Sequence, residues 1–161
     1  MSHDSPSQIP VRSAGLRFGL VAARFNQPLV DGLLARALTV LQAAGVREKD
    51  IRVIRVPGSH EVPWAAQQLA KASRCDCVIA LGVLIGGDTN HHEMVGASVS
   101  QALQSIALTT GVPMINGVVV AHTSAQARAR CVGKINRGAE FAQAALEMAA
   151  LRSTFRRNKK S

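Results

Sequence analysis

The sequence predicts an α/β fold, a three-layer αβα sandwich built on a four-stranded parallel sheet. Short apolar segments alternate along the chain with longer segments whose apolar residues recur every three or four positions, as in βαβ units. The apolar segment that ends at Ile85 is continuous, which is typical of a central strand covered on both faces. No internal repeat interrupts this alternation, and 161 residues suffice for one domain.

The first part of the chain supplies two strand–helix pairs. Residues 1–14 are polar and contain two prolines, so we expect a flexible arm there. A strand is predicted over 16–23, and a helix follows from Pro28, which suits a first helical turn. A second strand is predicted over 51–56, and an alanine-rich helix follows it over 61–72.

The second part of the chain is predicted to add two strands and three helices. The strands cover 77–85 and 113–120, and the helices cover 91–110, 124–132 and 138–155. Five of the last ten residues are arginine or lysine. We therefore expect one folded domain over 15–155, followed by a basic tail over 156–161.

Composition limits the classes of partner and the cellular location. The net charge of +9 owes much to the basic tail, for which solvation is the simplest interpretation. Aromatic residues make up 3% of the chain and tyrosine is absent, so a base-stacking surface for nucleic acid is not expected. No apolar run approaches the roughly 20 residues that span a membrane, and the N-terminus lacks signal-peptide features. Three cysteines argue against a disulfide framework, so we expect the cytoplasm.

Polar residues gather where the predicted strands end. In a parallel sheet, ligands bind in the crevice beyond the carboxyl ends of the strands. The four ends carry Arg24-Phe25-Asn26, Pro57-Gly58-Ser59-His60-Glu61, Ile85-Gly86-Gly87-Asp88-Thr89 and Ala121-His122. A binding site is therefore predicted at this edge of the sheet.

Two of these ends hold residues with two interpretations each. Phe25 either stacks on a planar ligand or packs under the following helix. Glu61 either complements the dipole of the helix that it begins, with Ser59 as the N-cap, or accepts hydrogen bonds from ligand hydroxyls. The pattern alone decides neither case.

The stretch after the third strand predicts an anion site beside a histidine. Residues 86–89 can present backbone N–H groups at a helix N-terminus. The alternative is that Asn90 or Thr89 caps the helix and Glu93 completes a capping box. His91, in the first turn, is the candidate for proton transfer.

Neither histidines nor cysteines have the spacing of a metal site. His91 and His92 are adjacent, so they point about 100° apart on a helix. Cys75 and Cys77 have no second pair to accompany them. We therefore predict no metal. Four basic residues follow the fourth strand and are either solvated or able to clamp a phosphate: Arg128, Arg130, Lys134 and Arg137.

Five stretches carry a family resemblance. They are Arg24-Phe25-Asn26, the segment from Val56 to Pro63, the segment from Gly82 to His91, Gly111-Val112-Pro113 with Asn116-Gly117-Val118, and the segment from Asn136 to Glu140. In this order and spacing they resemble the lumazine synthase family, over residues 15–155. The resemblance implies a flavodoxin-like fold and the condensation of 5-amino-6-(D-ribitylamino)uracil with 3,4-dihydroxy-2-butanone 4-phosphate. The products are 6,7-dimethyl-8-ribityllumazine, phosphate and water, and no metal or redox cofactor is implied.

The resemblance also implies a role for each site residue. Phe25 stacks on the pyrimidine, and the backbone of Ser59, His60 and Glu61 together with the Glu61 carboxylate holds the ribityl chain. Val83, Leu84 and Ile85 are further substrate-binding residues. Gly87, Asp88 and Thr89 cradle the phosphate, and His91 transfers protons. Asn116, Arg130 and Arg137 are contributed by a neighbouring subunit, with Arg130 on the phosphate.

The resemblance implies sites at the subunit interfaces of a homo-pentamer or of a sixty-subunit shell. The linker before the last helix carries no insertion, which favours the shell. Riboflavin synthase is the implied functional partner. The sequence departs from the family pattern at Gly86, where a larger residue is common, and at Arg137, where lysine is usual. The segment 131–135 is one residue short, so Arg128 is the alternative to Arg130 as the phosphate ligand.

Two other classes of function fit parts of the sequence. One is a flavin- or lumazine-binding protein without synthase activity, although His91, Glu61 and Arg130 are all present. The other is a shell whose basic tail recruits anionic cargo in addition to catalysis. Lumazine formation discriminates the first, and nucleic acid that co-purifies with the full chain but not with a tail-deleted chain discriminates the second.

Overall fold

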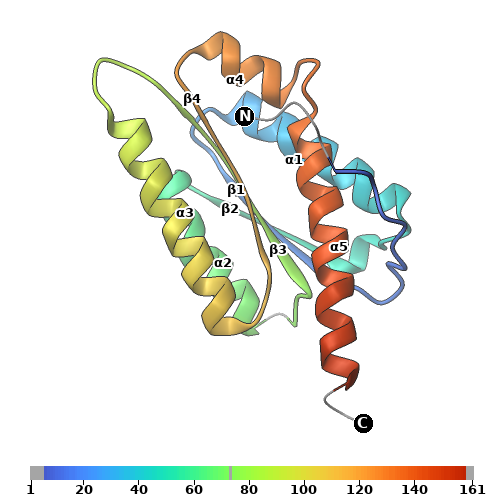
Figure 1. The fold of residues 1–161 in the computed structure, drawn as a ribbon. Helices are drawn as coiled ribbons and strands as arrows, with labels where there is room; N and C mark the ends of the chain where they lie inside the picture. Colours follow the sequence, from blue (N-terminus) through green and yellow to red (C-terminus); the bar gives the residue numbers. More distant parts are fainter. Residues whose placement is uncertain (1–5, 73, 159–161) are drawn as a thin grey trace.

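A computed structural model describes residues 6–72 and 74–158 of the chain. Within them a single sheet has four parallel strands in the order β2-β1-β3-β4 (Figure 1). The strands are β1 (Phe18–Ala23), β2 (Ile51–Val56), β3 (Cys77–Ile85) and β4 (Met114–Ala121). This order confirms the predicted parallel α/β sheet and has the flavodoxin-like arrangement.

Five α-helices lie within the described residues, and they cover both faces of the sheet. They are α1 (Gln27–Ala43), α2 (Val62–Ala72), α3 (His91–Thr110), α4 (Ser124–Cys131) and α5 (Arg137–Asn158), with short 3-10 turns at Glu48–Asp50 and Ser59–Glu61. Helices α1, α4 and α5 pack on one face, and α2 and α3 pack on the other (Figure 1). The predicted three-layer sandwich is therefore confirmed.

Small differences from the predicted boundaries have local causes. Strand β1 begins at Phe18 rather than at residue 16, because Arg17 donates its backbone N–H to the carboxylate of Asp76, at 2.9 Å, instead of to a neighbouring strand. Strand β4 begins after Pro113, which has no N–H to donate. Helix α5 begins one residue early, where the side chain of Asn136 accepts a hydrogen bond from the Ala139 N–H.

The two central strands are buried on both faces, as the continuous apolar pattern of 77–85 predicts. Successive residues alternate between the two layers. Leu20 and Ile79 pack toward α1 and α5, whereas Val21 and Val78 pack toward α2 and α3. The sheet is therefore a rigid central layer, and its carboxyl edge holds the loops that follow the strands.

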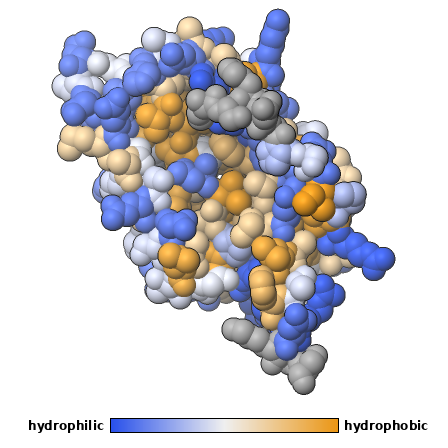
Figure 2. Space-filling model, viewed as in Figure 1, coloured by the Kyte–Doolittle hydropathy of each residue, from blue (hydrophilic) through white to orange (hydrophobic). Residues whose placement is uncertain are grey.

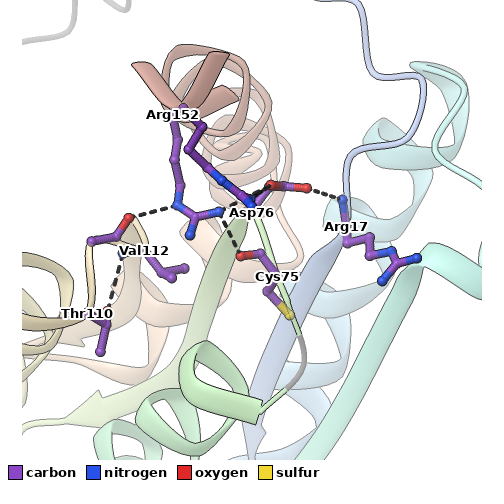
Figure 3. A network of polar contacts seen from close by, with 8 residues as sticks. Arg17, Cys75, Asp76, Thr110, Val112 and Arg152 are labelled. Atoms are coloured by element: carbon purple, nitrogen blue, oxygen red, sulfur yellow. Dashed lines mark hydrogen bonds and ion pairs between the residues drawn. The ribbon is translucent and has the colours of Figure 1, made fainter. Parts of the chain in front are cut away.

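An ionic network ties the opposite edge of the sheet to α5 (Figure 3). Asp76, directly before β3, accepts hydrogen bonds from the Arg17 N–H and from Nη1 of Arg152, the latter at 3.2 Å. Nε of Arg152 also donates to the Gly111 carbonyl, at 2.7 Å, and Nη1 of Arg156 lies 3.6 Å from Asp76. One carboxylate thus links the starts of β1 and β3 with the final turns of α5.

The predicted ends of the chain are partly within the described residues. Residues 6–14 have no helix or strand, and the Ser13 hydroxyl donates to the Ala44 carbonyl at the end of α1. Arg156 and Arg157, expected in the basic tail, belong to the last turn of α5. Residues 1–5 of the predicted arm and 159–161 of the predicted tail lie outside the described residues.

All three cysteines are free and buried. Burial away from water raises the pKa of the Cys131 thiol to about 11 and raises the pKa values of Cys75 and Cys77 as well. Such thiols are protonated at neutral pH and are therefore poor nucleophiles. None of the described helices is long and apolar enough to cross a membrane.

Apolar side chains gather on the surface between α3 and α5, where β4 forms an open edge of the sheet (Figure 2). The large exposed apolar residues of these three elements are Met94, Leu108, Val120, Met148, Leu151 and Phe155. Asn116 of β4 is exposed on the same face and lines a shallow hollow beside α3. Exposed apolar side chains gathered on one face are typical of a contact with another protein.

Candidate functional site

A cavity of about 460 Å³ lies at the carboxyl edge of the sheet, where the sequence predicts a site. It is lined by Phe25, Asn26, Gly58, Ser59, His60, Glu61, Val83, Leu84, Ile85, Gly87, Thr89, His91, His92 and Val95. Its size is that of a small-molecule site. It lies beyond β1 and β3, the neighbouring strands from which the chain connects to opposite sides of the sheet, and ligand sites of doubly wound folds occur at such points.

The end of β1 places an exposed aromatic ring at the cavity. Phe25 is 72% exposed, so the interpretation that it packs in the core is wrong. One edge of its ring lies against Gly58, where an added Cβ would be 3.2 Å from Cδ2 of Phe25. The ring is therefore held at its edge while the rest of it is free to contact a planar ligand.

Asn26 locks this strand end to β3. It has a left-handed backbone conformation, with φ of 55°, and its Nδ2 donates to the Val83 carbonyl at 2.9 Å. Asparagine tolerates this conformation better than most residues. Asn26 thereby fixes the turn that presents Phe25. The only sign of this role in the sequence is that Asn26 directly follows Phe25 after the strand.

The turn after β2 places Ser59, His60 and Glu61 at the cavity. Oε2 of Glu61 accepts a hydrogen bond from the Gly58 N–H at 2.8 Å, and Oε1 lies 3.9 Å from Nδ1 of the exposed His60. Glu61 therefore caps the 3-10 turn that precedes α2, instead of beginning α2 behind a Ser59 N-cap as expected. This role occupies one carboxylate oxygen only. Ser59 is not a side-chain cap: its hydroxyl is buried and has no partner among the described residues.

The loop after β3 leads directly into the first turn of α3. Gly87 is exposed with open space where a side chain would be, and Thr89 lines the cavity beside it. The capping box considered from the sequence is not formed, since the Asn90 side chain makes no capping hydrogen bond. The first N–H groups of α3 are consequently available to an anion. His91 and His92 both line the cavity, but His91 is exposed whereas His92 is buried.

Four predicted site residues do not line the cavity of the single chain. Asp88 is exposed in the loop after β3, and Asn116 is exposed on β4, where its Oδ1 accepts from the Val118 N–H. Arg130 donates from Nη1 to the Gln126 carbonyl within α4, at 3.2 Å, and Arg137 pairs with Glu140 in the first turn of α5. The fold of one chain thus unites ten of the predicted residues and leaves these four apart.

A comparison with known sequences identifies the family. A sequence model of 6,7-dimethyl-8-ribityllumazine synthase matches residues 15–153. The chain belongs to the lumazine synthase family. Proteins of this name include one from Thermococcus gammatolerans, 44% identical over 137 residues that cover 85% of this chain and 88% of that protein. The protein from Aquifex aeolicus is 46% identical, over 88% of this chain and 93% of that protein, and the one from Halorhodospira halophila is 46% identical, over 84% and 87%.

Family membership gives the chain its activity. Lumazine synthase is a transferase of riboflavin biosynthesis, and it condenses 5-amino-6-(D-ribitylamino)uracil with 3,4-dihydroxy-2-butanone 4-phosphate. The structure also shows why glycine stands at position 86, where the resemblance leads us to expect a larger residue. A Cβ on Gly86 would lie 2.7 Å from the His122 carbonyl oxygen, so the backbone of this chain leaves no room for a larger residue at that position.

Proposed function

We propose that the cavity at the carboxyl edge of the sheet carries out this condensation, with its two ends binding the two substrates. The observation that carries the proposal is the juxtaposition in one cavity of an exposed aromatic ring, a carboxylate with a spare oxygen and a glycine loop at the start of α3. The aromatic ring and the carboxylate suit a pyrimidine that carries a polyhydroxylated chain, and the glycine loop suits a phosphate.

The pyrimidine end is formed by β1, β2 and the wall of β3. Phe25 stacks on the flat ring, because an exposed aromatic face favours offset stacking. The backbone of Ser59, His60 and Glu61 and Oε1 of Glu61 bind the ribityl hydroxyls. The side chains and backbone of Val83, Leu84 and Ile85 form the wall against which the ring lies.

The phosphate end is formed by the loop that follows β3. Backbone N–H groups of Gly87, Asp88 and Thr89 and the first turn of α3 bind the phosphate, while the Asp88 carboxylate points away from it. A neighbouring subunit adds the guanidinium of Arg130, with Asn116 and Arg137 at the same interface. Their absence from the cavity of one chain and the apolar surface beside β4 both support a shared site.

His91 moves protons during the reaction. An amine adds to the ketone and the imine forms with loss of one water. Phosphate then leaves, and the second nitrogen adds to the remaining carbonyl and closes the ring with loss of a second water. An imidazole can accept and donate protons at neutral pH, and His91 stands between the two ends of the cavity. Much of the acceleration comes from holding two substrates in register.

We infer a cytoplasmic homo-pentamer, or sixty subunits in a closed shell, with riboflavin synthase as the functional partner that consumes the product. The linker between α4 and α5, over 132–136, carries no insertion, which favours the shell. Electron microscopy of the purified chain separates the two assemblies by size.

Product formation tests the proposed function directly. The chain is incubated with both substrates, and the lumazine absorbance and the released inorganic phosphate are followed together. Equal amounts of lumazine and phosphate support the proposal. Binding of the pyrimidine substrate without either product would instead indicate a lumazine-binding protein that lacks synthase activity.

Arg130→Ala is expected to raise the KM for the butanone phosphate about 10- to 100-fold, because a charge-assisted hydrogen bond to phosphate is lost. The KM for the pyrimidine should change little. Steady-state kinetics with each substrate varied in turn measures both values. Arg128→Ala, two positions away on α4, is the matched control, and a larger effect of that variant would transfer the role to Arg128.

Glu61→Gln is expected to raise the KM for the pyrimidine substrate about 10-fold while kcat changes little. The amide oxygen can still accept from the Gly58 N–H, so the turn is kept, but the charged acceptor for the ribityl hydroxyls is lost. The control uses a pyrimidine substrate whose ribityl chain is shortened. If the variant and the parent discriminate the two substrates equally, Glu61 does not bind that chain.

A further inference from the structure

His92 is a buried imidazole whose nitrogens lack partners. The residue is 9% exposed, and neither Nδ1 nor Nε2 has a hydrogen-bond partner among the described residues. Buried polar atoms in folded proteins almost always have one. The proposed condensation assigns no role to this ring, although it lines the same cavity as His91, the preceding residue.

The sheet register brings a second histidine and a carboxylate to the same place. Strands β3 and β4 end opposite each other, with Ile85 paired to Ala121, so His122 follows directly beside Gly86. The rings of His92 and His122 have centroids 5.8 Å apart and lie nearly perpendicular. Oε1 of Glu93 lies 3.9 Å from Nδ1 of His122.

Glycine at position 86 leaves the space between these groups open. A Cβ there would lie 3.2 Å from Nε2 of His92 and 2.7 Å from the carbonyl oxygen of His122. One donor atom each from His92, Glu93 and His122 therefore comes within 4.8 Å of the others. Such a cluster of two imidazoles and one carboxylate is the ligand set of a transition-metal ion.

We propose that His92, Glu93 and His122 bind a divalent transition-metal ion, with zinc as the preferred occupant. Metal–ligand bonds of about 2.0–2.2 Å place tetrahedral donor atoms roughly 3.4 Å apart, somewhat closer than these groups now lie. The side chains of His122 and Glu93 are 73% and 56% exposed, so they are free to turn inward toward the fixed ring of His92.

The proposed site adjoins the lumazine cavity, because His92 lines that cavity too. Nitrogen donors disfavour Mg²⁺ and Ca²⁺, which prefer oxygen, and three protein ligands leave a fourth position open on zinc. The ion would brace the loop after β3 against the end of β4. The proposal stands independently of the substrate roles assigned above, because none of its three ligands has such a role.

Zinc titration of the chelator-treated full chain tests the site. The chain carries no affinity tag and has His3→Ala, since His3 lies outside the described residues and brings an imidazole of its own. Calorimetry is expected to show one zinc ion per chain, and Co²⁺ in its place should give visible absorption bands of a coordinated ion. His122→Ala and Glu93→Gln should each weaken zinc binding at least tenfold, and His92→Phe should abolish it.

His60→Ala is the matched control. His60 and Glu61 form another exposed histidine–carboxylate pair with the same 3.9 Å separation, but no third ligand group accompanies them among the described residues. This variant should bind zinc as the parent does. Circular dichroism establishes that each variant is folded. Zinc affinity within twofold of the parent in both His122→Ala and Glu93→Gln, or an equal loss in His60→Ala, would overturn the proposal.

Discussion

His91→Ala is expected to lower kcat for lumazine formation about 10²- to 10⁴-fold, the range by which a positioned general acid or base contributes. The KM values of both substrates should change by less than about threefold. This split follows from the proposed roles, in which Phe25 and Glu61 bind one substrate and the loop over 87–89 binds the other, while His91 lines the same cavity. Steady-state kinetics with stopped-flow detection of phosphate release measures both quantities.

The pH profile separates a chemical role for His91 from a structural one. If the imidazole transfers the proton, the pH dependence of kcat should differ between the variant and the parent. An exogenous imidazole buffer should restore part of the rate, since removal of the side chain leaves space at the cavity wall. A variant that retains the parental kcat within threefold would assign the proton transfer to another group.

Mixed assemblies extend the same test to the shared site. A chain with His91→Ala and a chain with Arg130→Ala are each nearly inactive at low butanone phosphate. If one subunit supplies His91 and its neighbour supplies Arg130, assembling the two together regenerates some interfaces with both residues intact, and activity returns. If both residues act from the same chain, no interface regains the pair and the mixture stays inactive.

The order of the elements could be predicted because local sequence determines it. The strand over 77–85 and the helix over 91–110 match the structure at both ends, since a continuous apolar run and a Gly-Gly-Asp-Thr turn mark them clearly. The edge of the sheet that holds the cavity followed from the parallel topology. The residues at the strand ends could therefore be gathered into one site before their contacts were known.

Contacts between distant segments could not be predicted in this way. Phe25 contacts Gly58 along one edge of its ring and leaves the rest of the ring exposed. The Asn90 side chain does not cap the N–H groups in the first turn of α3. His92 and His122 are far apart in the sequence, and only the register of β3 with β4 brings them together. Spacing rules for metal ligands on one helix cannot detect such a cluster.

Asp76→Ala is expected to destabilise the fold by about 2–4 kcal/mol, the largest effect on stability that we predict for a polar residue. Its carboxylate accepts from the Arg17 N–H and from Arg152, whose side chain is 19% exposed (Figure 3). Removing it leaves a partly buried guanidinium and a backbone N–H without this acceptor, which costs more than the attraction itself contributed. Urea unfolding at one fixed protein concentration measures the change.

Two further variants determine which contacts of the Asp76 carboxylate account for the predicted loss of stability. Asp76→Asn keeps an acceptor for the Arg17 N–H but loses the charge, so it should lie between the parent and the alanine variant. Arg156→Ala removes an exposed partner of the same carboxylate and should cost less than about 1 kcal/mol. If Arg156→Ala lowered the free energy of unfolding as much as Asp76→Ala, the exposed ion pair between Arg156 and Asp76 would account for most of the stabilisation. In that case the effect of both variants should disappear at high salt, whereas a loss due to the buried contacts should persist.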